Sequence, residues 1–74
     1  MSMRTRKTRE LIHEGDYLAE VDVELIIADE GWSPYLSADD ARKLDNVRRA
    51  LMRGDVGSAA QLARIYRLTP VSAA

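Results

Sequence analysis

Carboxylates at alternating positions give this sequence its clearest capacity for chemistry: Glu20, Asp22 and Glu24. On a β-strand alternate side chains point to the same side, so these three form one negative row. Catalysis needs more than such a row. The chain has a single histidine, His13, and no cysteine, and no Ser-His-acid set or nucleophile-elbow motif frames any of its serines. We therefore expect a protein that is not an enzyme and that uses no cofactor.

Two further pairs of acids stand side by side in the sequence, Asp29-Glu30 and Asp39-Asp40. Neighbours in sequence do not face each other on a helix, and Asp39-Asp40 stands where acidic side chains favour the start of a helix. No group of residues has the spacing of metal ligands, so we expect no metal site. His13 adjoins a predicted turn, which favours a solvated hairpin residue over a catalytic base.

The row of carboxylates must be positioned by a strand. Residues 17–27 alternate in a pattern typical of a half-buried strand, with apolar side chains on one side and acids on the other. Residues 5–13 read as a preceding strand, and Glu14-Gly15-Asp16 as the turn, where Gly15 supplies the positive φ that tight hairpins require. The long second strand is then expected to offer an edge that recruits a neighbour.

Charge favours one register for this hairpin. A two-residue loop sets Arg9 opposite Asp22 and Lys7 opposite Glu24. Opposite charges across a strand pair stabilise it by a few tenths of a kcal/mol, and like charges oppose it.

Residues 32–36 are expected to form a short third strand, which Pro34 restricts to an edge. Ser37 resembles a helix cap, so a helix should begin at Ala38 and stop at Gly54. Its predicted core stripe is Ala41, Leu44, Val47 and Leu51.

Asp55 is expected to cap a second helix that runs to about Leu68, before Thr69-Pro70 ends it. Its predicted inward side chains are Ala59, Leu62, Ile65 and Tyr66. The predicted fold class is α+β, an antiparallel β-hairpin or three-stranded meander followed by a two-helix hairpin. We expect a single small domain over 1–74, divided into a β region (5–36), a helical hairpin (38–68) and a tail (69–74).

The net charge of −1 conceals three blocks: residues 1–13 carry +3, residues 14–37 carry −7 and residues 38–74 carry +3. An acidic centre suits a basic protein partner better than it suits nucleic acid. Glu20, Asp22 and Glu24 are therefore predicted to bind a partner. Trp32 and Tyr35 are candidate anchors for it, with a lid over the small core as the alternative role of these two aromatic side chains.

A second hypothesis uses the basic first strand, which holds Arg4, Arg6, Lys7 and Arg9. Two copies of the chain would form a dimeric β-ribbon that contacts DNA phosphates through these side chains. Their predicted pairing with the acids of the second strand weakens this hypothesis.

The size of the chain favours assembly. A domain of 74 residues buries only about 60–65% of its unfolded surface, and without disulfides it depends on packing or on a partner. We expect a homo-oligomer or a complex with another protein. The absence of cysteine fits a reducing cytoplasm, and neither a signal peptide nor a membrane span is expected.

Three segments together resemble a group of short bacterial proteins that in turn resemble antitoxins encoded beside small toxins: His13-Glu14-Gly15-Asp16-Tyr17, Gly31-Trp32-Ser33-Pro34-Tyr35-Leu36-Ser37, and residues 40–45 continuing through Leu68-Thr69-Pro70-Val71. The resemblance covers nearly the whole chain and transfers no functional residue. It implies a bacterial cytoplasmic protein that neutralises a small basic toxin by occupying its surface.

Overall fold

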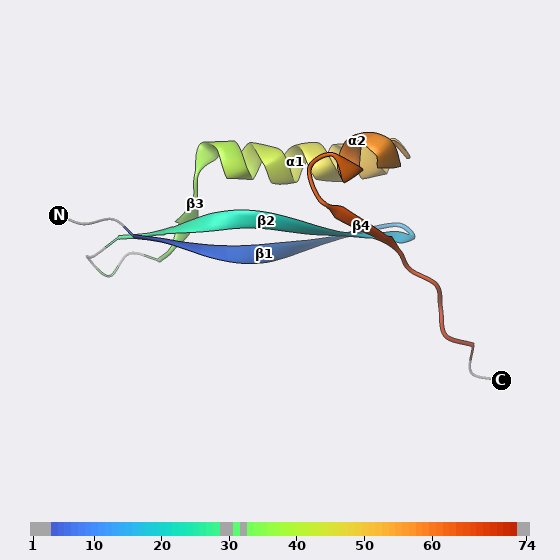
Figure 1. Ribbon diagram of the computed structural model, residues 1–74, viewed down its shortest axis with the longest axis horizontal. Coiled ribbons are helices and arrows are strands. Elements are labelled where there is room, and N and C mark those ends of the chain that lie inside the picture. Colours follow the sequence, from blue (N-terminus) through green and yellow to red (C-terminus); the bar gives the residue numbers. More distant parts are fainter. Residues whose placement is uncertain (1–3, 29–30, 32, 73–74) are drawn as a thin grey trace.

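The computed structural model describes residues 4–28, 31 and 33–72. The chain forms a four-stranded antiparallel sheet and two helices (Figure 1), which confirms the predicted α+β class with a β-hairpin followed by helices. In chain order the elements are β1 (Arg4–Glu14), β2 (Tyr17–Ile27), β3 (Tyr35–Leu36), α1 (Ala38–Met52), α2 (Val56–Ala60) and β4 (Arg64–Arg67).

The hairpin of β1 and β2 has the predicted two-residue loop, because Glu14 pairs with Tyr17 across the turn. Gly15 has a φ of 60°, a conformation that a side chain disfavours. Arg9 lies opposite Asp22, as charge predicts, and the same register sets Lys7 opposite Glu24.

The second strand is the centre of the sheet and not its edge, which corrects the prediction that it recruits a neighbour. β1 pairs with β2 along its whole length, while the other side of β2 is shared by two short strands. There β4 pairs with residues 17–20 and β3 with residues 25–26. The strand left with an outer edge is therefore β1.

α1 begins as predicted, with Ser37 as its cap: the Ser37 side chain accepts a hydrogen bond from the Asp40 amide at 3.1 Å. The predicted core stripe is partly wrong. Ala41 is exposed, and Ala50 is buried in addition to Val47 and Leu51. Leu44 is half-buried and packs against the core as predicted, so the inward stripe begins one turn later than the sequence indicates.

The second helix is shorter than predicted. Asp55 caps it as expected, accepting from the Ser58 amide, but α2 ends at Ala60 instead of Leu68. The chain reverses after α2, and Arg64–Arg67 becomes a strand because β2 has an open edge at residues 17–20 that needs a partner. The predicted inward side chains Leu62 and Tyr66 are 39% and 47% exposed as a result.

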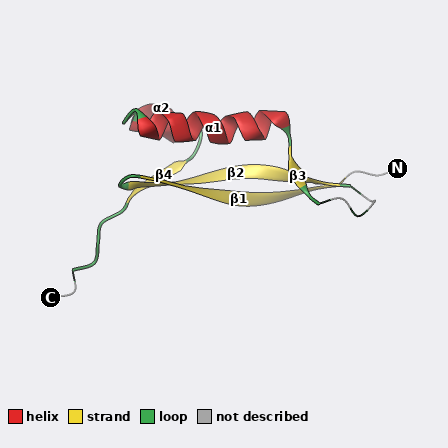
Figure 2. Cartoon of the chain, turned by 180° about the vertical axis from the view of Figure 1, so that it is seen from behind, coloured by secondary structure: helices red, strands yellow, loops and turns green. Residues whose placement is uncertain are grey.

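The core lies between the helices and one face of the sheet. Its buried side chains are Ile12, Ala19, Val21, Val23, Val47, Ala50, Leu51 and Ala59. Viewed from behind (Figure 2), α1 and α2 again lie along one side of the sheet, and the other side is without a helix. The helix-free side is called the open face below. It displays the alternate residues of β2 that include the three carboxylates.

Candidate partner-binding surface

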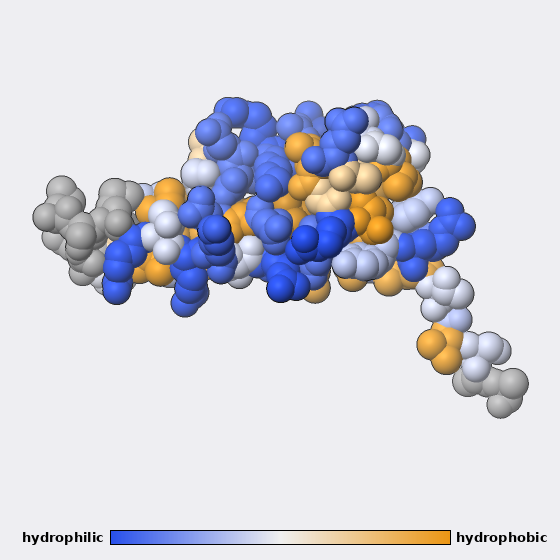
Figure 3. Space-filling view, in the orientation of Figure 1, coloured by the Kyte–Doolittle hydropathy of each residue, from blue (hydrophilic) through white to orange (hydrophobic). Residues whose placement is uncertain are grey.

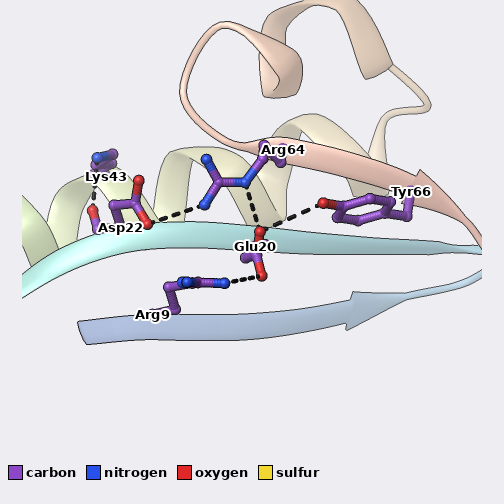
Figure 4. Close-up of polar contacts among 6 residues, drawn as sticks. All are labelled: Arg9, Glu20, Asp22, Lys43, Arg64 and Tyr66. Carbon is purple, nitrogen blue, oxygen red and sulfur yellow. Dashed lines mark hydrogen bonds and ion pairs between the residues drawn. The ribbon is translucent and has the colours of Figure 1, made fainter.

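The centre of the open face is an ion cluster around Glu20. Arg64 of β4 lies beside Glu20 in the sheet register, and its Nε is 2.6 Å from Oε1 of Glu20. Arg9 of β1 reaches diagonally across the hairpin, with Nη1 3.0 Å from Oε2. The Tyr66 hydroxyl donates to Oε1 at 3.5 Å. Figure 4 shows these side chains of β1 and β4 converging on the carboxylate of Glu20 in β2.

This cluster shifts the protonation of its members. The hydrogen bond from Arg64, followed by that from Arg9, lowers the pKa of the Glu20 carboxyl. The same bond to Glu20, together with the charge of Asp22, raises the pKa of Arg64. The Glu20 side chain keeps only 18% of its surface exposed. Its charge is thus satisfied within the chain, and Glu20 joins the three strands instead of standing free for a partner.

Asp22 is less engaged than Glu20. Its carboxylate lies 3.3 Å from Nη2 of Arg64, and the side chain is 66% exposed. Glu24 is exposed, and its carboxylate forms no ion pair with any described side chain. The negative row predicted from the sequence is therefore neutralised at one end and open at the other.

Side chains of α1 bond to the part of β2 that lies between the strands β4 and β3. Oδ2 of Asp40 accepts the Glu24 amide at 2.8 Å, and Nζ of Lys43 donates to the Asp22 carbonyl at 2.8 Å. These two bonds take the place of a strand at residues 21–24. An open depression lies beside this stretch, with Lys7 and Arg9 from β1, and Arg64 from β4, among its lining residues.

The outer edge of β1 has backbone groups that point away from the sheet. The bonds to Asp40 and Lys43 show that Glu24 and Asp22 turn their peptide groups away from β1. Residues directly opposite in an antiparallel pair either exchange both hydrogen bonds or neither. Lys7 and Arg9, which lie opposite Glu24 and Asp22, therefore also turn their peptide groups away from β2. By the two-residue period the outward groups of β1 belong to Thr5, Lys7, Arg9, Leu11 and His13.

Nothing in the described part of the chain pairs with this edge, and β1 is 11 residues long. Its cations Arg4, Arg6 and Lys7 are exposed and form no ion pair with a described residue. Leu11 is 62% exposed on the same strand. In the space-filling view (Figure 3), the lower rim of the molecule, where Figure 1 places β1, carries both hydrophilic and hydrophobic side chains.

The remaining predicted residues are placed as follows. Tyr35 is 47% exposed on β3 and pairs with Ile26, two residues beyond Glu24, so Tyr35 and Glu24 share the open face. Trp32 lies outside the described residues. His13 has Nε2 2.9 Å from the Gly15 carbonyl, in keeping with the predicted hairpin role.

Sequence reasoning missed Arg64, Tyr66 and Lys43, because it assigned residues 64–67 to a helix and gave α1 no role at the sheet edge. The adjacent Ile65-Tyr66 pair was the available signal, since β-branched and aromatic residues favour strands. No signal for Lys43 exists in the sequence, because its bond is to a backbone carbonyl.

Comparison of the chain with protein-family models, with curated proteins and with solved structures finds no match. Across residues 4–28, 31 and 33–72, no group of three or more His, Asp or Glu side chains is arranged to hold a metal ion. None of the described helices combines the length and apolar character needed to cross a membrane.

Proposed function

We propose that this chain is a non-catalytic, antitoxin-like module of the bacterial cytoplasm that binds another protein by pairing the outer edge of β1 with a strand of its partner. The observation that carries the proposal is the outer edge of the 11-residue strand β1, with which no described residue pairs. A strand edge presents a row of free N–H and C=O groups, and charged side chains on an edge restrict which strands pair with it. The exposed cations of β1 oppose a basic strand, but they do not cover these backbone groups. Strand addition at an exposed edge is a recurrent mode of protein recognition.

The difference between the outer edges of β1 and β2 supports this proposal. Along the edge of β2 that faces away from β1, the strands β3 and β4 and two side chains of α1 bond to the backbone. At the outer edge of β1, the described residues supply no such cover. The described residues thus cover the outer backbone groups of β2 and leave those of β1 accessible.

The open face extends the proposed interface. Glu24 and Tyr35 are accessible there and remain candidates for contact with a basic partner, as does Asp22 in part. Glu20 is assigned a different role, because Arg9 and Arg64 already bind its carboxylate.

Co-expression with the product of the adjacent gene tests the proposal. We expect the two proteins to co-purify, and expression of this chain to relieve any toxicity of its neighbour. Lys7→Pro removes an outward N–H that the chain's own sheet does not use, so the fold should persist while the complex weakens about tenfold. Lys7→Gln is the matched control, since it removes the charge and keeps the N–H. Equal binding by Lys7→Pro and the unaltered chain would contradict strand addition at β1.

A second candidate function, binding of DNA by a dimeric β-ribbon, is favoured by one observation: Arg4, Arg6 and Lys7 have no carboxylate partner among the described residues. A gel shift at rising salt separates the two. Phosphate contacts predict a shift that weakens steeply with salt, whereas the protein-binding proposal predicts no shift under the same conditions.

A further inference from the structure

We infer that the strand added to β1 is acidic, an extended segment of a partner protein with carboxylates at alternate positions. This inference rests on the proposed function and adds to it the chemistry of the partner's segment. It reverses, for this edge, the expectation that the partner surface is basic.

The exposed charges of β1 determine which charge the partner segment must carry. Arg9 is already bound by Glu20, which leaves Arg4, Arg6 and Lys7 exposed at the edge. Directly opposite side chains in an antiparallel pair have Cβ atoms about 4.5–5.5 Å apart. Any strand that pairs here therefore brings its own side chains into ion-pair range of three cations.

The spacing of the cations also sets a pattern for the incoming strand. Arg4 and Arg6 are two residues apart and share one side of the sheet, while Lys7 points to the other. Two carboxylates spaced by one residue reach Arg4 and Arg6 together. The chain's own β2 has the same alternation of acids, with Asp22 and Glu24 opposite Arg9 and Lys7 in register, and its Glu20 forms the ion pair with Arg9.

A second copy of β1 is a poor occupant of the same edge. In a symmetric antiparallel pair centred on one residue, like residues meet at the centre and their neighbours meet in turn. Centring on Lys7 or Arg9 sets that cation against itself, and centring on Thr8 sets Lys7 against Arg9. Centring on Arg6 again opposes two cations. Like charges directly opposite destabilise strand pairing, so charge disfavours self-association in every register centred on residues 6–9, where an acidic segment meets the same cations favourably.

An NMR titration of the 15N-labelled chain with a peptide of alternating Thr and Glu tests the inference. We expect amide shifts at the outward N–H groups of Thr5, Lys7 and Arg9, and no comparable shifts with a peptide of alternating Thr and Lys. Raising the NaCl concentration from about 0.05 M to about 0.5 M should weaken the response.

Matched charge reversals locate the contact. Arg6→Glu should weaken binding of the acidic peptide about tenfold. Arg48→Glu changes the net charge equally but alters an exposed position of α1, so binding should change little. Retained amide dispersion in both variants shows that they fold.

Three results would overturn the inference: equal shifts with the two peptides, no shift with the acidic one, or stronger perturbation of the same amides by a DNA duplex. The co-expression assay separates this failure from failure of the proposed function. A complex that is weakened by Lys7→Pro but indifferent to Arg6→Glu refutes the acidic segment and leaves strand addition standing.

Discussion

The position of Glu20 is predicted from the sequence, but its ion-pair partners are not. Alternation correctly predicts that Glu20 lies on the charged side of β2, near the cations of β1. The observed partners differ from the expected ones, because Arg9 sits opposite Asp22 but reaches the diagonal neighbour Glu20. The Arg9 side chain is long enough to reach either the opposite acid or the diagonal one. The sequence does not indicate which of the two it binds.

The ion cluster makes stability depend on pH. Because the pKa of Glu20 is lowered on folding from its ordinary value of 4.5, its contribution is present above 4.5 and is lost as the pH falls through the lowered value. Glu20→Gln should therefore melt at a lower temperature than the unaltered chain at neutral pH. The difference between the two should shrink progressively below pH 4.5.

Thermal unfolding followed by circular dichroism over this pH range measures the effect. Glu10→Gln is a suitable control, since Glu10 is an exposed acid of β1 that forms no ion pair with a described residue. A difference between Glu20→Gln and the unaltered chain that stays constant with pH would contradict the assigned role.

Among the elements, those with a local signal are the ones that sequence reasoning places correctly. The hairpin is marked by Gly15, and α1 by Ser37 at its start and Gly54, with φ of 76°, at its end. β4 has no such mark. Its Arg64-Ile65-Tyr66-Arg67 sequence suits the last turns of a helix as well as a strand, and the free edge of β2 decides between them. Pairing with β2 is a tertiary contact, and the local sequence pattern does not predict it.

The cap of α1 gives a prediction at this scale. Ser37→Ala removes the acceptor for the Asp40 amide and should lower the free energy of unfolding by about 1 kcal/mol. Asp40 also holds the Glu24 amide, so the loss should loosen the sheet edge that α1 covers. Chemical denaturation measures the change, and Ser72→Ala in the exposed tail is the control. No difference between the two variants would contradict the role of the cap.

The whole molecule has a core that is small for its surface. Val21 and Val47 are its largest fully buried side chains. A chain of 74 residues has a free energy of unfolding of roughly 4 to 11 kcal/mol. Against that margin, loss of one large core side chain matters.

Leu51, 5% exposed, and its neighbour Met52, 66% exposed, form a matched pair on α1. Leu51→Ala should lower the free energy of unfolding by about 2–5 kcal/mol. Met52→Ala should change stability by less than about 0.5 kcal/mol. Denaturant unfolding of the two variants checks the orientation of α1, and equal losses would contradict it.

At the scale of the whole molecule the sequence predicts the segregation of charge, but it assigns the outer edge of the sheet to the wrong strand. The error follows from the missing β4. Without it, β2 has a bare side at residues 17–20, and the longer acidic strand looks like the edge. With β4 and β3 in place, β1 is the exposed strand and its charge is positive.

Amide hydrogen exchange along β1 tests the central claim most directly. In the isolated chain we predict fast exchange at Lys7, Arg9 and Leu11, whose N–H groups face outward, and slow exchange at Thr8 and Glu10, which bond to β2. Binding of the partner should then protect the outward amides. Outward amides that are already protected in the isolated chain, or that stay unprotected in the complex, would contradict an open edge that functions by strand addition.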